Sequence, residues 1–172
     1  LVSPHRGHLD ILDSLALLVK ERPQTKLLLV GEGPYRGTLE NKVAALGLAE
    51  HVIFTGHVQH DKITLYIGAC DVCMFLKKLT SYGLSSLKLY EYLAAGRPII
   101  GRDVPSIQFI KDQDIGTLLP LNASFEQVKN AIRTFLDRPD LALVSQRARK
   151  LAETTYNWGK SAEKIEEICE KL

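Results

Sequence analysis

The chain has 172 residues, which is long enough for one well-packed domain and too short for two ordinary ones. Its 22 lysines and arginines nearly balance its 20 aspartates and glutamates, so the charge gives no case for nucleic acid as a partner. No apolar stretch approaches the roughly 20 residues of a membrane span, and no signal peptide is evident. The cysteines are expected to be reduced thiols, so a cytoplasmic location is the default expectation.

Helical and strand-like hydrophobic patterns alternate along the first 123 residues. Apolar residues recur at helical spacing over 11–19, whereas 26–30 is a short, continuous apolar run typical of a buried parallel strand. The same two patterns predict helices over 35–46, 61–69 and 86–95, and strands over 52–54, 72–76, 98–100 and 117–119. This alternation predicts an α/β fold, a doubly wound Rossmann-like parallel sheet of about six strands with helices on both faces.

The chain becomes wholly helical from Ser124 onward. Ser124 and Gln127 form a capping-box pattern before an amphipathic segment, and further helices are predicted over 141–153 and 162–172. An apolar stripe in the last of these helices, preceded by Trp158, needs a partner surface. We therefore predict a single domain over 1–172, with an α/β core over 1–123 and a helical C-terminal tail over 124–172.

Two of the three cysteines, Cys70 and Cys73, have CxxC spacing. A structural zinc site needs about four ligands, and no second Cys/His pair stands at a supporting distance. The pair also lies where a helix ends and a buried strand begins. We therefore expect buried, reduced thiols and no metal.

Functional residues are expected in the loops that follow the strands, because doubly wound sheets bind ligands beyond the carboxyl ends of their strands. The helix start at Ser85 and Ser86, with Lys88 in its first turn, combines unpaired backbone N–H groups, the positive end of the helix dipole and a cation. These features suit a phosphate, and Glu91 on the same helix face could accept hydrogen bonds from ribose hydroxyls. A capped helix with a solvated Lys/Glu pair is the alternative.

Other strand-end and loop residues give weaker signals. Gly31 and Gly33 follow a strand without GxGxxG spacing, so a plain turn is favoured when they are taken alone. Arg6 could reach a diphosphate, for which its planar guanidinium is suited. His57 follows the strand over 52–54 and is expected at the mouth of the crevice.

Taken together and in order, these segments resemble the C-terminal domain of group 1 (family 4) retaining glycosyltransferases of the GT-B fold. The resemblance covers essentially the whole chain and rests on five segments: 6–10, 28–36, 52–56, 70–72 and 91–100. The last of these, Glu-Tyr-Leu-Ala-Ala-Gly-Arg-Pro-Ile-Ile, is similar to the family's Glu-Ala-Met-Ala-x-Gly-Lys-Pro-Val-Val signature.

The resemblance implies roles for individual residues. Glu91 matches the second glutamate of the family's Glu-x7-Glu motif, which holds the ribose. Arg6 stands where a phosphate-binding lysine is usual, so Arg6 and Lys88 are the expected catalytic residues, which stabilise the departing diphosphate. The other expected donor-binding residues belong to the strand-end loops and the helix start: Gly31, Gly33, His57, Val58, Gly83, Ser85, Ser86 and Leu87.

Two positions depart from the family pattern. Gly83 stands where the first motif glutamate contacts the donor sugar, and Gln108 stands where a glutamate is common. The motif therefore does not indicate which sugar is preferred. The sequence leaves the donor sugar, the nucleotide base and the acceptor undetermined.

The resemblance implies retaining transfer of a hexose from a nucleoside-diphosphate sugar to a glycan or lipid-linked acceptor, as in polysaccharide biosynthesis. No cofactor and no metal are expected. The family's N-terminal acceptor-binding domain is not in the sequence, so we expect this chain alone to be inactive. The full-length enzyme could attach peripherally to the inner face of the membrane.

Three other functions could use a fold of this kind. A nucleotide-sugar epimerase shares the fold and would isomerise the donor. A non-catalytic nucleotide-sugar-binding module is favoured by Gly83 and Gln108. A receiver-type signalling domain lacks the acidic cluster expected at a strand end.

Overall fold

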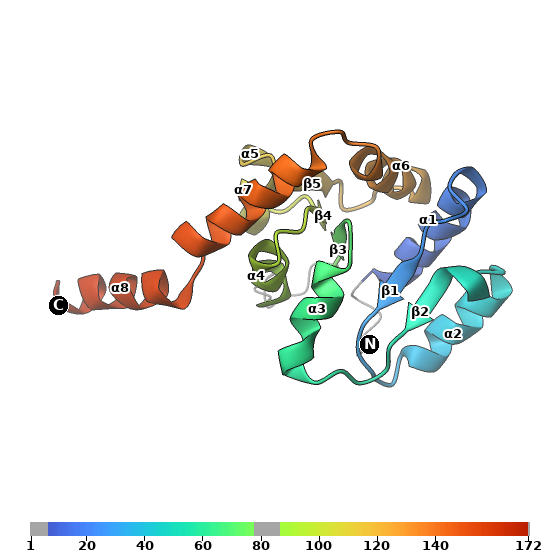
Figure 1. The fold of residues 1–172 in the computed structure, drawn as a ribbon, viewed down its shortest axis with the longest axis horizontal. Coiled ribbons are helices and arrows are strands. Elements are labelled where there is room, and N and C mark those ends of the chain that lie inside the picture. The colour runs from blue at the N-terminus through green and yellow to red at the C-terminus, as the bar shows by residue number, and fades with distance from the viewer. Residues whose placement is uncertain (1–6, 78–86, 172) are drawn as a thin grey trace.

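The computed structural model describes residues 7–77 and 87–171, and strands and helices alternate along them (Figure 1). The first part contains α1 (His8–Glu21), β1 (Leu27–Leu29), α2 (Arg36–Ala45), β2 (Val52–Phe54), α3 (Ile63–Gly68) and β3 (Cys73–Phe75). The second contains α4 (Leu87–Ala94), β4 (Ile99–Arg102), α5 (Phe109–Asp112), β5 (Gly116–Leu119), α6 (Phe125–Leu136), α7 (Leu141–Thr154) and α8 (Trp158–Cys169). Short 3-10 turns occupy Ala49–His51, His60–Lys62 and Pro105–Ile107.

The strands form two parallel sheets. β1 pairs with β2, Leu27 opposite Val52, and β3, β4 and β5 form the second sheet in that order. These pairings confirm the predicted parallel α/β fold. The predicted count of about six strands is not confirmed, because the described residues contain five.

Helices cover both faces of the three-stranded sheet. Adjacent β4 residues point to opposite sides: Ile99 packs in a cluster with α4, α5 and α7, whereas Ile100 packs in a cluster with α1 and α6. Both isoleucines are fully buried. The helices α6 and α7 of the predicted tail therefore bury their apolar faces directly against the sheet.

A separate hydrophobic cluster packs α1 and α2 against the sheet formed by β1 and β2. Leu12 and Leu15 of α1 contact a cluster that contains Leu29 of β1, Leu39 of α2 and Val52 of β2. Since α1 also belongs to the cluster around Ile100, it packs on both sheets. Residues at helical spacing on α1 thus connect the two halves of the domain.

A buried ion pair fixes α1 to the end of β4. The Arg102 guanidinium, 2% exposed as a residue, donates to the Asp10 carboxylate at 2.8 Å. It also donates to the Pro120 carbonyl at 2.9 Å, just beyond β5. One cation therefore ties together α1, β4 and the segment that follows β5.

The helix starts in the C-terminal part were predicted with mixed success. The capping box of α6 is confirmed: Gln127 N donates to Ser124 Oγ at 3.2 Å, and Ser124 N donates to Gln127 Oε1 at 2.9 Å. The predicted start of the last helix at residue 162 is wrong. α8 begins at Trp158 because Asn157 caps it, with Oδ1 accepting from Lys160 N at 2.9 Å.

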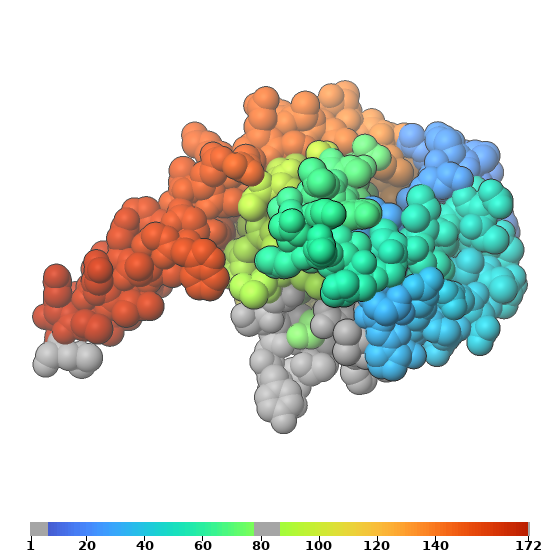
Figure 2. Space-filling view, turned by 60° about the horizontal axis from the view of Figure 1, so that its bottom comes forward, coloured from blue at the N-terminus to red at the C-terminus, as the bar shows by residue number. Residues whose placement is uncertain are grey.

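The helix α8 projects from the body of the domain (Figures 1 and 2). All of its residues are exposed, among them Trp158 (81%), Ile165 (62%) and Ile168 (55%). A row of large apolar side chains in water is typical of a surface that packs against another protein segment or molecule.

We therefore expect the amides of α8 in this chain to exchange with solvent much faster than those of β4, because no tertiary packing protects the helix. Hydrogen-exchange mass spectrometry of the monomer tests this. Equal protection in α8 and β4 would show that α8 packs on this domain.

No helix within residues 7–77 and 87–171 is both long and apolar enough to cross a lipid bilayer.

Candidate functional site

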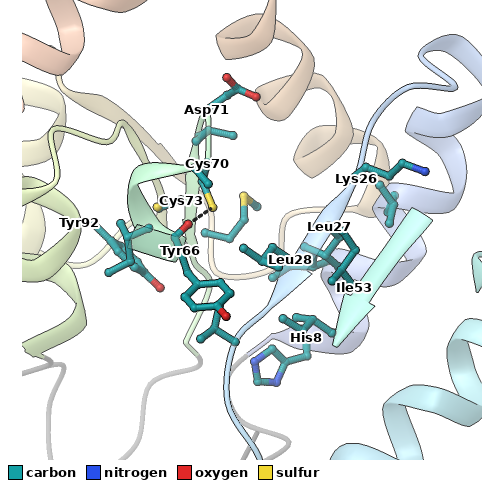
Figure 3. A pocket seen from close by; sticks show the side chains of 18 of the residues that line it. His8, Lys26, Leu27, Leu28, Ile53, Tyr66, Cys70, Asp71, Cys73 and Tyr92 are labelled. Atoms are coloured by element: carbon teal, nitrogen blue, oxygen red, sulfur yellow. Dashed lines mark hydrogen bonds between the residues drawn. The ribbon is translucent and has the colours of Figure 1, made fainter. Parts of the chain in front are cut away.

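A cavity of about 910 Å³ lies between the two sheets. Its walls include residues 27–32 of β1 and the loop after it, residues 71–74 at β3, and parts of α1 and α3 (Figure 3). At the carboxyl ends of the strands the lining becomes polar. There the cavity is bordered by His8, Gly31, Glu32, His57, Val58, Lys88, Glu91 and Tyr92.

The structure brings five of the predicted site residues together. Gly31, His57, Val58, Lys88 and Glu91 come from three separate segments and line the same cavity. Gly33 and Leu87 are not part of this lining, and Leu87 is 66% exposed. Four further predicted residues lie outside the described residues: Arg6, Gly83, Ser85 and Ser86.

The glycines after β1 serve the turn itself. Gly31 has φ 111° and Gly33 has φ 154°, values that side chains with a Cβ seldom adopt. Gly31 N donates to the Gly56 carbonyl at 3.1 Å, which links the loop after β1 to the loop after β2. These glycines thereby place the two loops side by side at the mouth of the cavity.

An acidic side chain at this mouth is held by the next helix. The Glu32 carboxylate accepts from Arg36 at 2.5 Å, and Arg36 also donates to Glu40 at 2.7 Å. The hydrogen bond from Arg36 lowers the pKa of Glu32 below its usual value. The loop after β1 is therefore fixed to the first turn of α2.

The helix α4 presents a polar edge to the cavity. Leu89 and Leu93 are buried in the core, so Lys88 and Glu91, three residues apart, share the face that borders the cavity. Lys88 is exposed and Glu91 is half-buried. The shared helix face agrees with their spacing, and their roles toward a phosphate and a ribose stay predictions.

Sequence reasoning missed several residues at the same place. A small adjoining cavity of about 60 Å³ is lined by His8, Lys77, Lys88 and Tyr92 together with residues of β3. His8 comes from the first turn of α1 and Lys77 from the segment just after β3, so two lysines and a histidine converge. Only the general expectation that ligands bind in the loops after the strands pointed to Lys77, which follows the strand predicted over 72–76.

The CxxC cysteines also border the cavity, at its inner end. Cys73 is buried as predicted, but Cys70 is only half-buried, and all three cysteines of the chain are free thiols. Cys70 Sγ donates to the Tyr66 carbonyl at 3.3 Å (Figure 3). A hydrogen bond from Cys73 lowers the pKa of Cys70 to about 7, and the same bond together with burial raises the pKa of Cys73.

Within the described part of the chain, no three His, Cys, Asp or Glu side chains are grouped as metal ligands would be.

Comparison with known proteins finds chains of similar sequence. The family model described as "Glycosyl transferases group 1" matches residues 2–158. The chain is 32% identical over 109 residues to alpha-monoglucosyldiacylglycerol synthase of Streptococcus pneumoniae, covering 63% of this chain and 24% of that protein. It is 25% identical over 171 residues to a GDP-mannose-dependent alpha-(1-6)-phosphatidylinositol monomannoside mannosyltransferase of Mycolicibacterium smegmatis, covering 96% and 44%.

Solved structures share the fold. Anabaena Alr3699/HepE in complex with UDP superimposes with a TM-score of 0.85 at 21% identity, covering 99% of this chain and 47% of that one. The chain thus spans less than half the length of the relatives named here.

Proposed function

Because the chain belongs to the group 1 glycosyl transferases, we propose that it is the donor-binding domain of a glycosyltransferase and binds a nucleoside-diphosphate sugar. The observation that carries the proposal is the convergence of Gly31, His57, Lys88 and Glu91 on one cavity at the carboxyl ends of the strands. The GDP-mannose dependence of the related mannosyltransferase and the UDP held by HepE support a sugar-nucleotide donor.

Each part of the donor has a proposed counterpart. Lys88, with Lys77 and His8 beside it, is proposed to surround the diphosphate. Arg6, which lies outside the described residues, is proposed as a further phosphate ligand. Glu91 accepts hydrogen bonds from the ribose, and His57 and Val58 border the base.

The proposed reaction breaks the bond between the anomeric carbon and the diphosphate oxygen. The anomeric carbon then bonds to an acceptor hydroxyl oxygen, the hydroxyl proton passes to the departing diphosphate oxygen, and the configuration is retained. Lys88 lowers the barrier by stabilising negative charge on the departing diphosphate. We propose that neither a cofactor nor a metal takes part, and that another domain of the whole protein supplies the glycan or lipid-linked acceptor.

Calorimetric titration with UDP, GDP, ADP and CDP, free and as sugar conjugates, tests the proposal on the whole protein. We expect one base to bind clearly more tightly than the others. Incubation of that donor with acceptors should release the free nucleoside diphosphate and a glycosylated product. Failure of all four nucleotides to bind would refute the donor site, and recovery of an isomerised donor would assign an epimerase.

Lys88→Gln should weaken binding of the nucleoside diphosphate by about 1.5–3 kcal/mol, the usual contribution of a hydrogen bond to a charged group. Binding of the unphosphorylated nucleoside should not change, because Lys88 is proposed to contact only phosphate. Lys111→Gln, which removes an exposed lysine of α5 outside the cavity lining, is the matched control. An equal loss for nucleoside and diphosphate would argue against a phosphate contact.

A further inference from the structure

The two cysteines of the CxxC pair are held side by side where α3 ends and β3 begins (Figure 3). Cys70 N donates to the Ile67 carbonyl at 3.1 Å, so Cys70 is fixed to the last turn of α3. Cys73 is the first residue of β3, and its N–H donates to the Pro98 carbonyl at 2.8 Å. The bend over 71–72 between these two anchors brings the thiols within hydrogen-bonding reach of each other.

A cation is held beside the pair. Arg97, in the segment between α4 and β4, donates from its guanidinium to the Gly68 carbonyl. Gly68 is the last residue of α3, so the positive charge is fixed two positions before Cys70. The hydrogen bond from Cys73 is the largest cause that lowers the pKa of Cys70, and the charge of Arg97 acts in the same direction, whereas Asp71 opposes it.

The two thiols differ in burial and in proton affinity. Cys70 is half-buried, and its Sγ is held by a hydrogen bond to the Tyr66 carbonyl at 3.3 Å. Cys73 is buried, and the hydrogen bond with Cys70 together with burial raises its pKa. The thiolate is the nucleophilic form of cysteine, and a nearby cation favours it. Cys70 is therefore the thiol suited to attack, and Cys73 is the protonated thiol next to it.

We propose that Cys70 is a site of reversible oxidation by small hydroperoxides, and that Cys73 converts the oxidised form into an intramolecular disulfide. The CxxC spacing is that of dithiol pairs which form and break disulfides. Because Cys70 is only half-buried and Cys73 is buried, a small oxidant suits the pair better than another protein does.

The proposed chemistry takes two steps. The Cys70 thiolate attacks one peroxide oxygen, the O–O bond breaks, and water or an alcohol leaves after taking up a proton, so that Cys70 becomes a sulfenic acid. The Cys73 sulfur then bonds to the Cys70 sulfur, the S–O bond breaks, and the hydroxyl group leaves as water with the Cys73 proton. The two thiols lose two electrons, which reduce the hydroperoxide, and a dithiol reductant restores both thiols by exchange.

This site is separate from the proposed donor site. Cys70 and Cys73 lie at the amino end of β3, whereas the polar mouth of the cavity lies at the carboxyl ends of the strands. The contacts that define the thiol pair all lie within residues 66–98. The inference therefore holds whatever ligand the mouth binds.

Peptide mapping by mass spectrometry, after the whole protein is treated with hydrogen peroxide, tests the inference. The peptide that contains Cys70 and Cys73 should lose two hydrogens and resist alkylation, about 10-fold sooner than Cys169 is modified. Cys169 is the internal control, because it is exposed on α8 and has no cysteine three residues away. Dithiothreitol should make both thiols alkylatable again. Oxidation of Cys70 no faster than that of Cys169, or a disulfide that joins two molecules, would overturn the inference.

Single variants separate the proposed roles. Cys73→Ser should stop the reaction at the Cys70 sulfenic acid, which dimedone labels, and Cys70→Ser should leave Cys73 unmodified. Arg97→Gln should slow the oxidation of Cys70 several-fold at neutral pH, whereas Arg97→Lys, which keeps the charge, should retain most of the rate. Equal dimedone labelling of Cys73 in Cys70→Ser would contradict the assignment of Cys70 as the attacking thiol. The measurement on the parent protein decides the inference even where a variant does not fold.

Discussion

Replacing Asp10 with asparagine is expected to lower the free energy of unfolding by about 3–5 kcal/mol, because it leaves the Arg102 guanidinium buried without a counter-ion. Arg102 is 2% exposed, and Asp10 is the carboxylate that pairs with it at 2.8 Å. The other contact of Arg102, the Pro120 carbonyl at 2.9 Å, carries no charge to compensate it. Urea unfolding of the parent protein and the variant gives the difference.

A neighbouring ion pair on the same helix provides the control. Asp13 pairs with Lys42 at 2.6 Å, and the lysine side chain is 32% exposed, so Asp13→Asn should cost less than about 1 kcal/mol. Combining Asp10→Asn with Arg102→Met should recover much of the loss, since both buried partners are then uncharged. Equal effects of the Asp10 and Asp13 variants would show that the buried pair contributes nothing special to anchoring α1.

Gly116→Ala should destabilise the protein by about 3 kcal/mol or more through overpacking between β4 and β5. Gly116 lies opposite Ile99 in the sheet, and a Cβ there would come within 2.0 Å of the Ile99 carbonyl oxygen and 2.6 Å of Ile110 Cγ2. Both isoleucines are fully buried, so neither can move aside without disturbing the core. The strand pair would have to separate, which thermal unfolding detects as a lower Tm.

The matched substitution is Gly37→Ala in the first turn of α2. A Cβ at Gly37 meets nothing within 4 Å, and alanine favours the helix over glycine by about 0.5–1 kcal/mol. The two variants should therefore change Tm in opposite directions. A fall of similar size in both would mean that β4 and β5 are not packed as closely as the structure indicates.

The fold prediction rested on hydrophobic runs and on helix-capping residues. The strand predicted over 52–54 has those bounds in the structure, and the capping box at Ser124 forms as predicted. Such local signals predict structure well because few conformations suit a continuous apolar run, or a serine three residues before a glutamine. The four-residue helix α5 was missed because so short a segment shows no helical period.

The split of the sheet could not be seen in the sequence. Residues 26–30 were predicted to be a buried strand because they are apolar on both faces, and β1 does form there. Whether such a strand has one neighbour or two depends on segments far away in the chain. Only the structure shows that, among the described residues, β1 pairs with β2 alone and that Leu28 borders a cavity.

The sequence predicted the site residues that belong to one local motif. It missed those that only the folded chain brings together. Lys88 and Glu91 share a helix face that their spacing already indicated, and both border the cavity. His8 and Tyr92 lie in the site because α1 and α4 begin at the same edge of the sheet. No spacing rule links residues 84 positions apart, so their proximity required the structure.

Binding of natural and 2′,3′-dideoxy forms of the preferred nucleoside diphosphate to the whole protein and its Glu91→Ala variant tests the donor site most directly. If Glu91 holds the ribose, the parent protein prefers the natural form. The variant then loses about 1–3 kcal/mol of binding free energy for that form and binds both forms nearly equally. A Glu91→Ala protein that keeps the parent's preference for the natural ribose would contradict the proposed donor site.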